Sequence, residues 1–201
     1  MDIDGNFRRV GNANVELTRQ LVEILSEESW YQNAGDTHEA TKGEGSQVIY
    51  LVHDEQLRHD QPLRQPALEV FSKSIRPVLA VTANCFDGSR DGRELTEQHG
   101  MGYFVRARLL RVMNGATFNA AGDTSFSQTH AHRVHVPIVT TSDVDCTVGD
   151  ETLNIPAGEI YEINNCRARS IQNRGANPCV HLVLEYVLKG EAPPHDSGVN
   201  G

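Results

Sequence analysis

The stretch RVHVP at residues 133–137 decides the fold class of this chain, together with GEIYEINN at 158–165 and HLV at 181–183. All three belong to a series of short β-branched or aromatic runs that starts near residue 100. Turn residues separate these runs, which cover 102–113, 133–140, 144–148, 151–155, 159–163, 169–172 and 179–188. Short strands repeated at such spacing indicate a sandwich or a barrel.

The first hundred residues predict mainly helix. Apolar residues recur at helical spacing over 13–31, where we expect one amphipathic helix capped by Asn14. A second helix is expected over 68–84, with an interruption at Pro77. Between them, 48–52 predicts a strand and 53–66 an exposed connection. We therefore expect one domain over 1–190, with a helical, capping part at 1–100 and a β core at 101–190, before a disordered tail at 191–201.

Composition excludes several classes of function. The 201 residues carry a formal net charge of -9 and a sequence pI near 5.4, which argues against nucleic acid and anionic membranes as partners. No apolar run is long enough to span a bilayer, and Met1–Gly5 has no features of a secretory signal, so a soluble, cytoplasmic protein is expected. The four cysteines form no C-x-x-C pair, which predicts reduced thiols rather than structural zinc or disulfides.

Five segments in the second half together resemble the aspartyl/asparaginyl (and proline) β-hydroxylase family of iron(II) and 2-oxoglutarate dependent oxygenases. The matching segments are 106–112, 115–123, 133–135, 158–173 and 181–182. The combination of these segments is specific for this family, although no single segment is. The resemblance implies a double-stranded β-helix, a jelly-roll, cupin-like barrel that is mainly β with N-terminal helices.

The chain departs from that family where the family binds iron and cosubstrate. The aspartate position is kept as Asp123, but the two iron-binding histidine positions fall on Ala121 and Arg169. The arginine that pairs with the distal cosubstrate carboxylate is replaced by Cys179. Alanine has no lone pair, and a guanidinium repels a divalent cation. We therefore expect no metal, and we expect Arg169 to supply a fixed positive charge in its place and to pair with Asp123.

The resemblance also implies one barrel pocket where the candidate residues converge, with Cys179 at its rim. The candidate catalytic residues are Asp123, His135 and Arg169; the candidate ligand-binding residues are Arg133, His135, Arg169, Cys179 and His181. Two cationic anchors and an acid/base group suit an anionic, carboxylate-bearing small molecule. No cofactor is expected.

Three functions stay open at this point. The first is a metal-free relative of the hydroxylases that binds an anion or catalyses a non-oxidative isomerisation or cyclisation. The second is an active iron(II)/2-oxoglutarate hydroxylase of an amino acid or of peptidyl Asp, Asn or Pro, with ligands recruited from Asp123, His130, His132 or His135. The third is a non-catalytic binding module. Strand parity places His132 outside the barrel, so His130 and His132 predict a solvated strand entry or a surface metal site. The N-terminal helices allow a homodimer.

Overall fold

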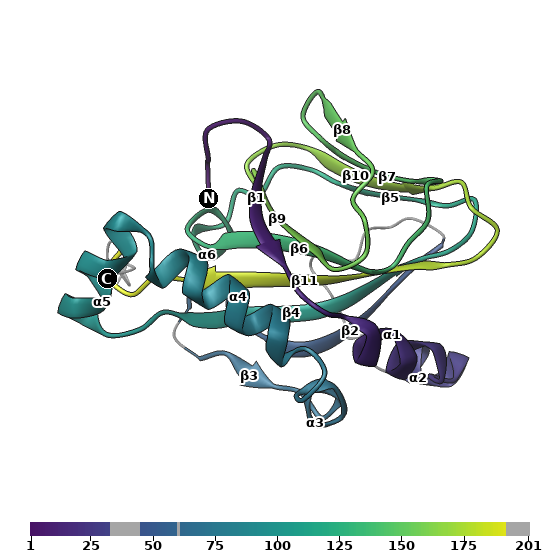
Figure 1. Cartoon of the computed structure of the whole chain (residues 1–201), viewed down its shortest axis with the longest axis horizontal. Coiled ribbons are helices and arrows are strands. Elements are labelled where there is room, and N and C mark those ends of the chain that lie inside the picture. The colour runs from purple at the N-terminus through teal and green to yellow at the C-terminus, as the bar shows by residue number, and fades with distance from the viewer. Residues whose placement is uncertain (33–44, 60, 192–201) are drawn as a thin grey trace, which may run out of the picture.

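Two antiparallel sheets face each other and form a barrel (Figure 1). The computed structural model describes residues 1–32, 45–59 and 61–191. In these residues, the larger sheet has the order β1-β9-β6-β11-β4-β2-β3 and the smaller sheet the order β5-β10-β7-β8. The larger sheet contains β1 Phe7–Asn12, β2 Ser46–His53, β3 Leu63–Arg64, β4 Tyr103–Val112, β6 His132–Val139, β9 Glu159–Ile163 and β11 Cys179–Val187. The smaller sheet contains β5 Thr117–Ala120, β7 Val144–Val148, β8 Glu151–Leu153 and β10 Arg169–Asn173. This is the predicted double-stranded β-helix.

Each strand run predicted beyond residue 100 contains a strand, and so does the run at 48–52. The sequence did not reveal β1, β3 and β5. β3 has two residues and pairs with β2. β1 has the polar sequence FRRVGN and takes its place by pairing with β9. β5 has four residues, too few for a periodic signal, and pairs with β10. The expected helical part at 1–100 therefore also contributes strands to the larger sheet.

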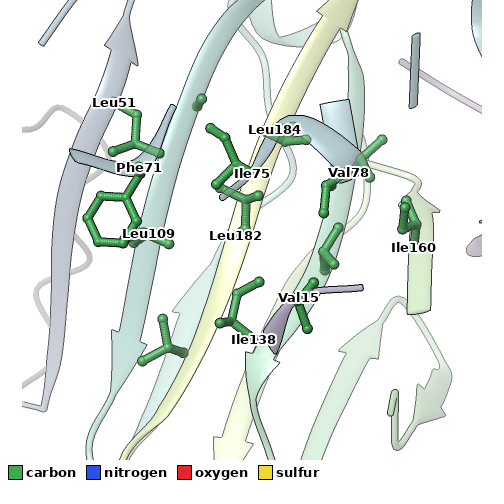
Figure 2. Packing of buried hydrophobic residues seen from close by; sticks show 14 of the residues in the cluster. Val15, Leu51, Phe71, Ile75, Val78, Leu109, Ile138, Ile160, Leu182 and Leu184 are labelled. Atoms are coloured by element: carbon green, nitrogen blue, oxygen red, sulfur yellow. The ribbon is translucent and has the colours of Figure 1, made fainter. Parts of the chain in front are cut away.

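Helices cover the outer face of the larger sheet (Figure 1). They are α1 Glu16–Glu23, α2 Glu27–Gln32, α3 Ala67–Phe71, α4 Arg76–Asp87 and α5 Arg90–His99, and a short helix, α6 Phe126–Thr129, precedes β6. Under them lies the main hydrophobic core, where Leu182 and Leu184 of β11 meet Ile75 and Val78 of the helical layer (Figure 2). Burying each such side chain contributes about 1.5–3 kcal/mol. None of the described helices is long and apolar enough to cross a membrane.

The prediction of one helix over 13–31 is wrong. The structure has α1 and α2, with a break between them. Ile24, which lies at this break, is 78% exposed. The hydroxyl of Ser26 accepts a hydrogen bond from the backbone N–H of Ser29 (3.3 Å) and so begins α2. Asn14 accepts a hydrogen bond from the backbone N–H of Glu16 (2.9 Å), but the N-cap residue of α1 is Val15, so the predicted cap is one residue too early.

The second predicted helix is divided, as the proline suggested. α3 ends at Phe71, and α4 begins at Arg76 with Pro77 in its first turn, where the missing N–H breaks no helical hydrogen bond. The connection at 53–66 is not wholly exposed, because Asp54 and His59 are buried. Of the tail predicted at 191–201, all but Glu191 lies outside the described residues.

A second hydrophobic cluster fills the barrel between the two sheets. Alternation along β11 separates the clusters: Leu182 and Leu184 face the helices, whereas Cys179 and Val183 pack inside the barrel. Towards one end of the barrel the inward residues change from apolar to charged, with Arg106 and Arg108 on β4 and Glu185 on β11. The candidate site lies at this polar end.

Candidate functional site

A cavity of about 310 Å³ opens at the polar end of the barrel. Both sheets contribute to it, together with the loop after β2, the segment after β5 and α6. It is lined by Val48, Tyr50, Leu57, Arg108, Phe118, Asn119, Ala120, Ala121, Gly122, Asp123, Thr124, Gln128 and Arg169. The volume lies at the lower end of the range of small-molecule pockets. Its lining combines apolar and charged side chains.

The pairing of β5 with β10 brings the predicted positions together. Arg169 is the register partner of Ala120, so its side chain lies against the residues that follow β5. Its Nη1 donates to the carbonyl oxygen of Ala121 (2.9 Å), and its Nη2 donates to Oδ1 of Asp123 (2.8 Å). The expected pairing of Arg169 with Asp123 is therefore present. Gly122 allows this close packing, because a Cβ there would collide with the carbonyl oxygen of Cys166.

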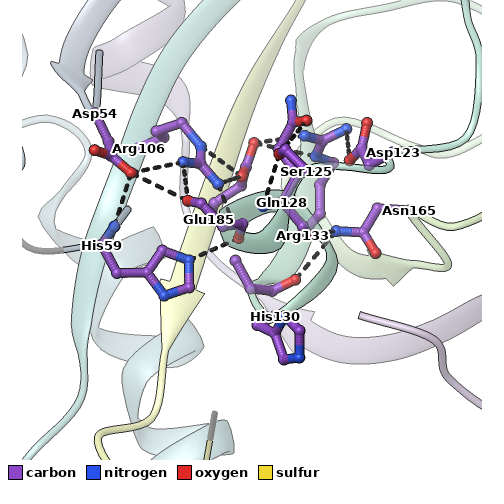
Figure 3. A network of polar contacts seen from close by, with 12 residues as sticks. Asp54, His59, Arg106, Asp123, Ser125, Gln128, His130, Arg133, Asn165 and Glu185 are labelled. Carbon is purple, nitrogen blue, oxygen red and sulfur yellow. Dashed lines mark hydrogen bonds and ion pairs between the residues drawn. The ribbon is translucent and has the colours of Figure 1, made fainter. Parts of the chain in front are cut away.

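A chain of buried ion pairs continues from Asp123 into the barrel (Figure 3). Arg133 contacts Oδ2 of Asp123 (2.8 Å) with Nη1 and donates to Oε1 of Glu185 (2.7 Å) with Nη2. On the far side of Glu185, Nε of Arg106 donates to Oε2 (2.6 Å), and Arg106 also pairs with Asp54 (3.0 Å). Acids and bases thus alternate from the cavity to the loop after β2.

Glu185 is the centre of this network. Three arginines surround it, because Arg108 Nη1 lies 3.7 Å from its Oε1, in addition to the pairs with Arg106 and Arg133. Burial alone would raise the pKa of the Glu185 carboxyl, but these guanidinium groups outweigh burial and hold the pKa well below its usual range. Glu185 is therefore ionised and fixes the positions of the three arginines.

Arg133 is fully buried and does not line the cavity, contrary to the prediction that it contacts a ligand directly there. Its guanidinium forms ion pairs with Asp123 and Glu185. Asp123, Arg133 and Arg169 do converge, as expected. The physical reason for the difference is depth: Arg133 lies behind Asp123, and Asp123 and Arg169 reach the cavity.

His135 and His181 lie in the barrel interior, with ring centroids 6.2 Å apart. His135 lines a small internal void that Arg169 also lines, but neither histidine lines the larger cavity. Burial lowers the pKa of His135 well below its usual value, and the neighbouring His181 and arginines lower it further. Burial lowers the pKa of His181 to about 4. Both imidazoles are therefore neutral near pH 7.

Cys179 does not lie at the rim of the pocket, and the prediction of that position is wrong. It is 1% exposed and packs with Val183 and Cys146 in the apolar interior of the barrel. Burial raises the pKa of the Cys179 thiol to about 11, which disfavours the thiolate that a nucleophile needs. The Cys179 side chain points into the barrel, but it lies at the apolar end of the barrel, away from the cavity.

His132 does point away from the barrel interior, but the expected solvated strand entry is wrong. It is buried under α4, where Phe86 stacks on its ring at 4.2 Å between centroids. Its Nδ1 lies 2.6 Å from Glu162 Oε1, and its Nε2 lies 3.1 Å from Glu191 Oε2. Burial lowers the pKa of His132, but these hydrogen bonds outweigh it and raise the pKa. His130 instead stacks on Phe126, so the two rings form no shared surface site.

Sequence reasoning missed Arg108 and Leu57 as cavity residues, and Arg106 and Glu185 as supports for the site. A signal was available for the charged residues on the strands. Arg106 and Arg108 are two apart in a strand that otherwise reads as buried, so both share the inward face. Leu57 had no such signal, since it lies in a connection that was expected to be exposed.

The sequence matches no family model and no curated protein. Among solved structures, the chain is similar to an oxidoreductase of the 2OG-Fe(II) oxygenase family from Burkholderia pseudomallei. The identity is 13% and the TM-score 0.53, over 72% of this chain and 69% of that one. It is also similar to the non-heme monooxygenase ThoJ in a nickel complex, with 12% identity and a TM-score of 0.51, over 91% of this chain and 74% of that one. The described chain thus shares the fold of these two proteins.

Proposed function

We propose that this protein is a relative of the aspartyl/asparaginyl hydroxylases that has lost the iron site, and that its barrel cavity binds a carboxylate-bearing small molecule. The observation that carries the proposal is the position of Arg169. Its guanidinium contacts both Ala121 and Asp123, the neighbours it would have if it occupied the place of the metal. Fold similarity to 2OG-Fe(II) oxygenases supports the relationship.

The residues at this place do not fit iron. A non-haem iron(II) site needs two imidazoles and usually a carboxylate on one face. Here Ala121 offers no side-chain donor atom, and Arg169 and Arg133 lie against the two carboxylate oxygens of Asp123. Across the residues that the structure describes, no three His, Cys, Asp or Glu side chains are grouped so as to hold a metal ion.

The cavity suits an anion. Two arginines, Arg108 and Arg169, line it from opposite sheets, and a guanidinium has five N–H donors that serve several acceptors at once. Glu185 and Asp123 hold these guanidinium groups in place, so little conformational entropy is lost when a ligand binds. A carboxylate with its two coplanar oxygens matches the planar fork of an arginine.

The geometry supports binding more directly than catalysis. Asp123 is the carboxylate among the cavity-lining residues, so an isomerisation or cyclisation would use it for proton transfer. His135, the other acid/base candidate, is buried behind the cavity. Its role would be to keep a neutral imidazole next to Arg169 across the small internal void.

The test is a calorimetric titration of metal-stripped protein with acetate, succinate, 2-oxoglutarate and octanoate. At least one is expected to bind, and Arg108→Gln and Arg169→Gln should each weaken that binding at least about tenfold, the value of a lost charged hydrogen bond. Arg174→Gln is the matched control, because Arg174 pairs with Asp145 on the surface and does not line the cavity. Circular dichroism confirms that each variant folds. Binding that is equal in all four proteins would refute the proposal.

A further inference from the structure

The loop after β2 holds two residues in an unusual backbone conformation. Leu57 has φ 53° and His59 has φ 70°, and these are the only non-glycine residues with positive φ in the described part of the chain. A residue with a Cβ is strained in this region, and a leucine there is an outlier. Such strain persists only where the surrounding structure enforces it, and it concentrates at ligand sites.

Buried polar contacts enforce this conformation. Oδ2 of Asp54 accepts from the backbone N–H of His59 (3.1 Å) and from Arg106 Nη1 (3.0 Å). The Nε2 of His59 lies 2.6 Å from the carbonyl oxygen of Ser127, and the hydroxyl of Tyr103 donates to the carbonyl oxygen of His59 (2.7 Å). The loop is therefore tied to β4 and to α6 on both sides of Leu57 (Figure 3).

The consequence of this conformation is the placement of one apolar side chain. Leu57 lines the cavity, and Val48, Tyr50 and Phe118 extend the apolar part of its lining. The same cavity contains Arg108 and Arg169. A ligand that fills it must therefore present an anionic group to the arginines and an apolar group to the remaining wall.

We propose that Leu57 is a specificity residue, held in a strained loop so that the cavity selects carboxylates with an apolar tail over short or fully polar carboxylates. This inference rests on the proposed carboxylate binding and adds the chemical class of the ligand. Leu57 acts by contact with the tail, whereas the arginines bind the head group. The two contributions are separable by experiment.

The experiment is a calorimetric titration with straight-chain monocarboxylates from acetate to octanoate. In the wild-type protein each added methylene should raise affinity about fourfold until the cavity is filled. Leu57→Asn is the informative variant, because asparagine tolerates positive φ while it presents a polar side chain. It should keep the unfolding temperature of the wild type and lower the gain in affinity per methylene, to which Val48, Tyr50 and Phe118 still contribute. Leu57→Met should restore that gain.

The control is Leu63→Asn, which changes an exposed leucine of the same connection outside the cavity and should leave the titration series unchanged. Binding with no chain-length dependence in the wild type, or the same dependence in Leu57→Asn, would overturn the role of Leu57 and leave carboxylate binding intact. Failure of every member of the series to bind would overturn both proposals.

Discussion

Arg169 and Asp123 form a buried ion pair of 2.8 Å at the mouth of the barrel, between the first residue of β10 and the segment that follows β5. Because Arg133 contacts the other oxygen of Asp123, the carboxylate lies between two cations. The two guanidinium groups thus fix the position of the Asp123 carboxylate, whose side chain is 5% exposed. Substitution of Asp123, Arg133 or Arg169 should therefore change the charge and the geometry of the site.

The double change Ala121→His and Arg169→His should create affinity for iron(II). It removes one of the two cations next to Asp123, leaves Arg133 in place, and adds two imidazoles at positions that the structure already brings together. Anaerobic calorimetry with iron(II) should detect binding in the micromolar range. Ala121→His alone is the control and should bind no iron, since Arg169 remains. A folded double variant without iron affinity would mean that these residues are not the equivalents of the family's ligands.

Glu185→Gln should destabilise the protein strongly. The change removes the negative charge shared by Arg106, Arg108 and Arg133 and leaves buried cations without it. Loss of one partner from a buried ion pair typically reduces the free energy of unfolding by about 3–5 kcal/mol. Urea unfolding followed by circular dichroism measures this change. The control is Asp145→Asn, which breaks the surface pair with Arg174 and should cost at most about 1 kcal/mol. Equal losses in the two variants would contradict the central role of Glu185.

Stability should fall in mild acid partly because of His181. Its pKa is lowered from 6.5 to about 4 by burial, so the unfolded chain binds the proton more readily and stability decreases as the pH falls through this window. Integrated between about pH 7 and about pH 5, this single group accounts for about 2 kcal/mol. His181→Leu removes the ionisable group and should flatten the pH dependence by that amount in urea titrations. The control, replacement of the exposed His99 by Gln, should leave the pH dependence of stability unchanged. An unchanged slope in His181→Leu would contradict a neutral, buried imidazole at His181.

The β-branched and aromatic runs beyond residue 100 indicated a sandwich or a barrel, and the resemblance to the hydroxylase family implied the double-stranded β-helix; each of these runs contains a strand. Elements that depend on contacts with other residues were harder to predict from the sequence. β1 is polar and is a strand because it pairs with β9. The break between α1 and α2 depends on the hydrogen bond from the Ser29 N–H to the Ser26 hydroxyl. In the site, Asp123 and Arg169 could be predicted from the motif pattern. The role of Leu57 could not be predicted, because no periodicity in the charged connection 53–66 indicates that one of its residues lines the cavity.

Depth explains the remaining differences in the site. Strand parity correctly places Arg133 and His135 inside the barrel and His132 outside, but parity does not give the position along the barrel axis. Cys179 is inward and lies among apolar side chains, far enough along β11 to miss the cavity lining. Outward position likewise did not mean exposure for His132, since α4 covers that face.

The central claim is that the cavity binds carboxylates through arginines and without iron. The most direct test is an anaerobic calorimetric titration of the wild-type protein with iron(II), alone and with 2-oxoglutarate, beside a titration with the best carboxylate of the panel in the presence of a chelator. The account predicts no iron(II) binding tighter than about 10 μM, and carboxylate affinity that the chelator does not change. Stoichiometric iron(II) binding that 2-oxoglutarate strengthens, or carboxylate binding that requires iron, would contradict it.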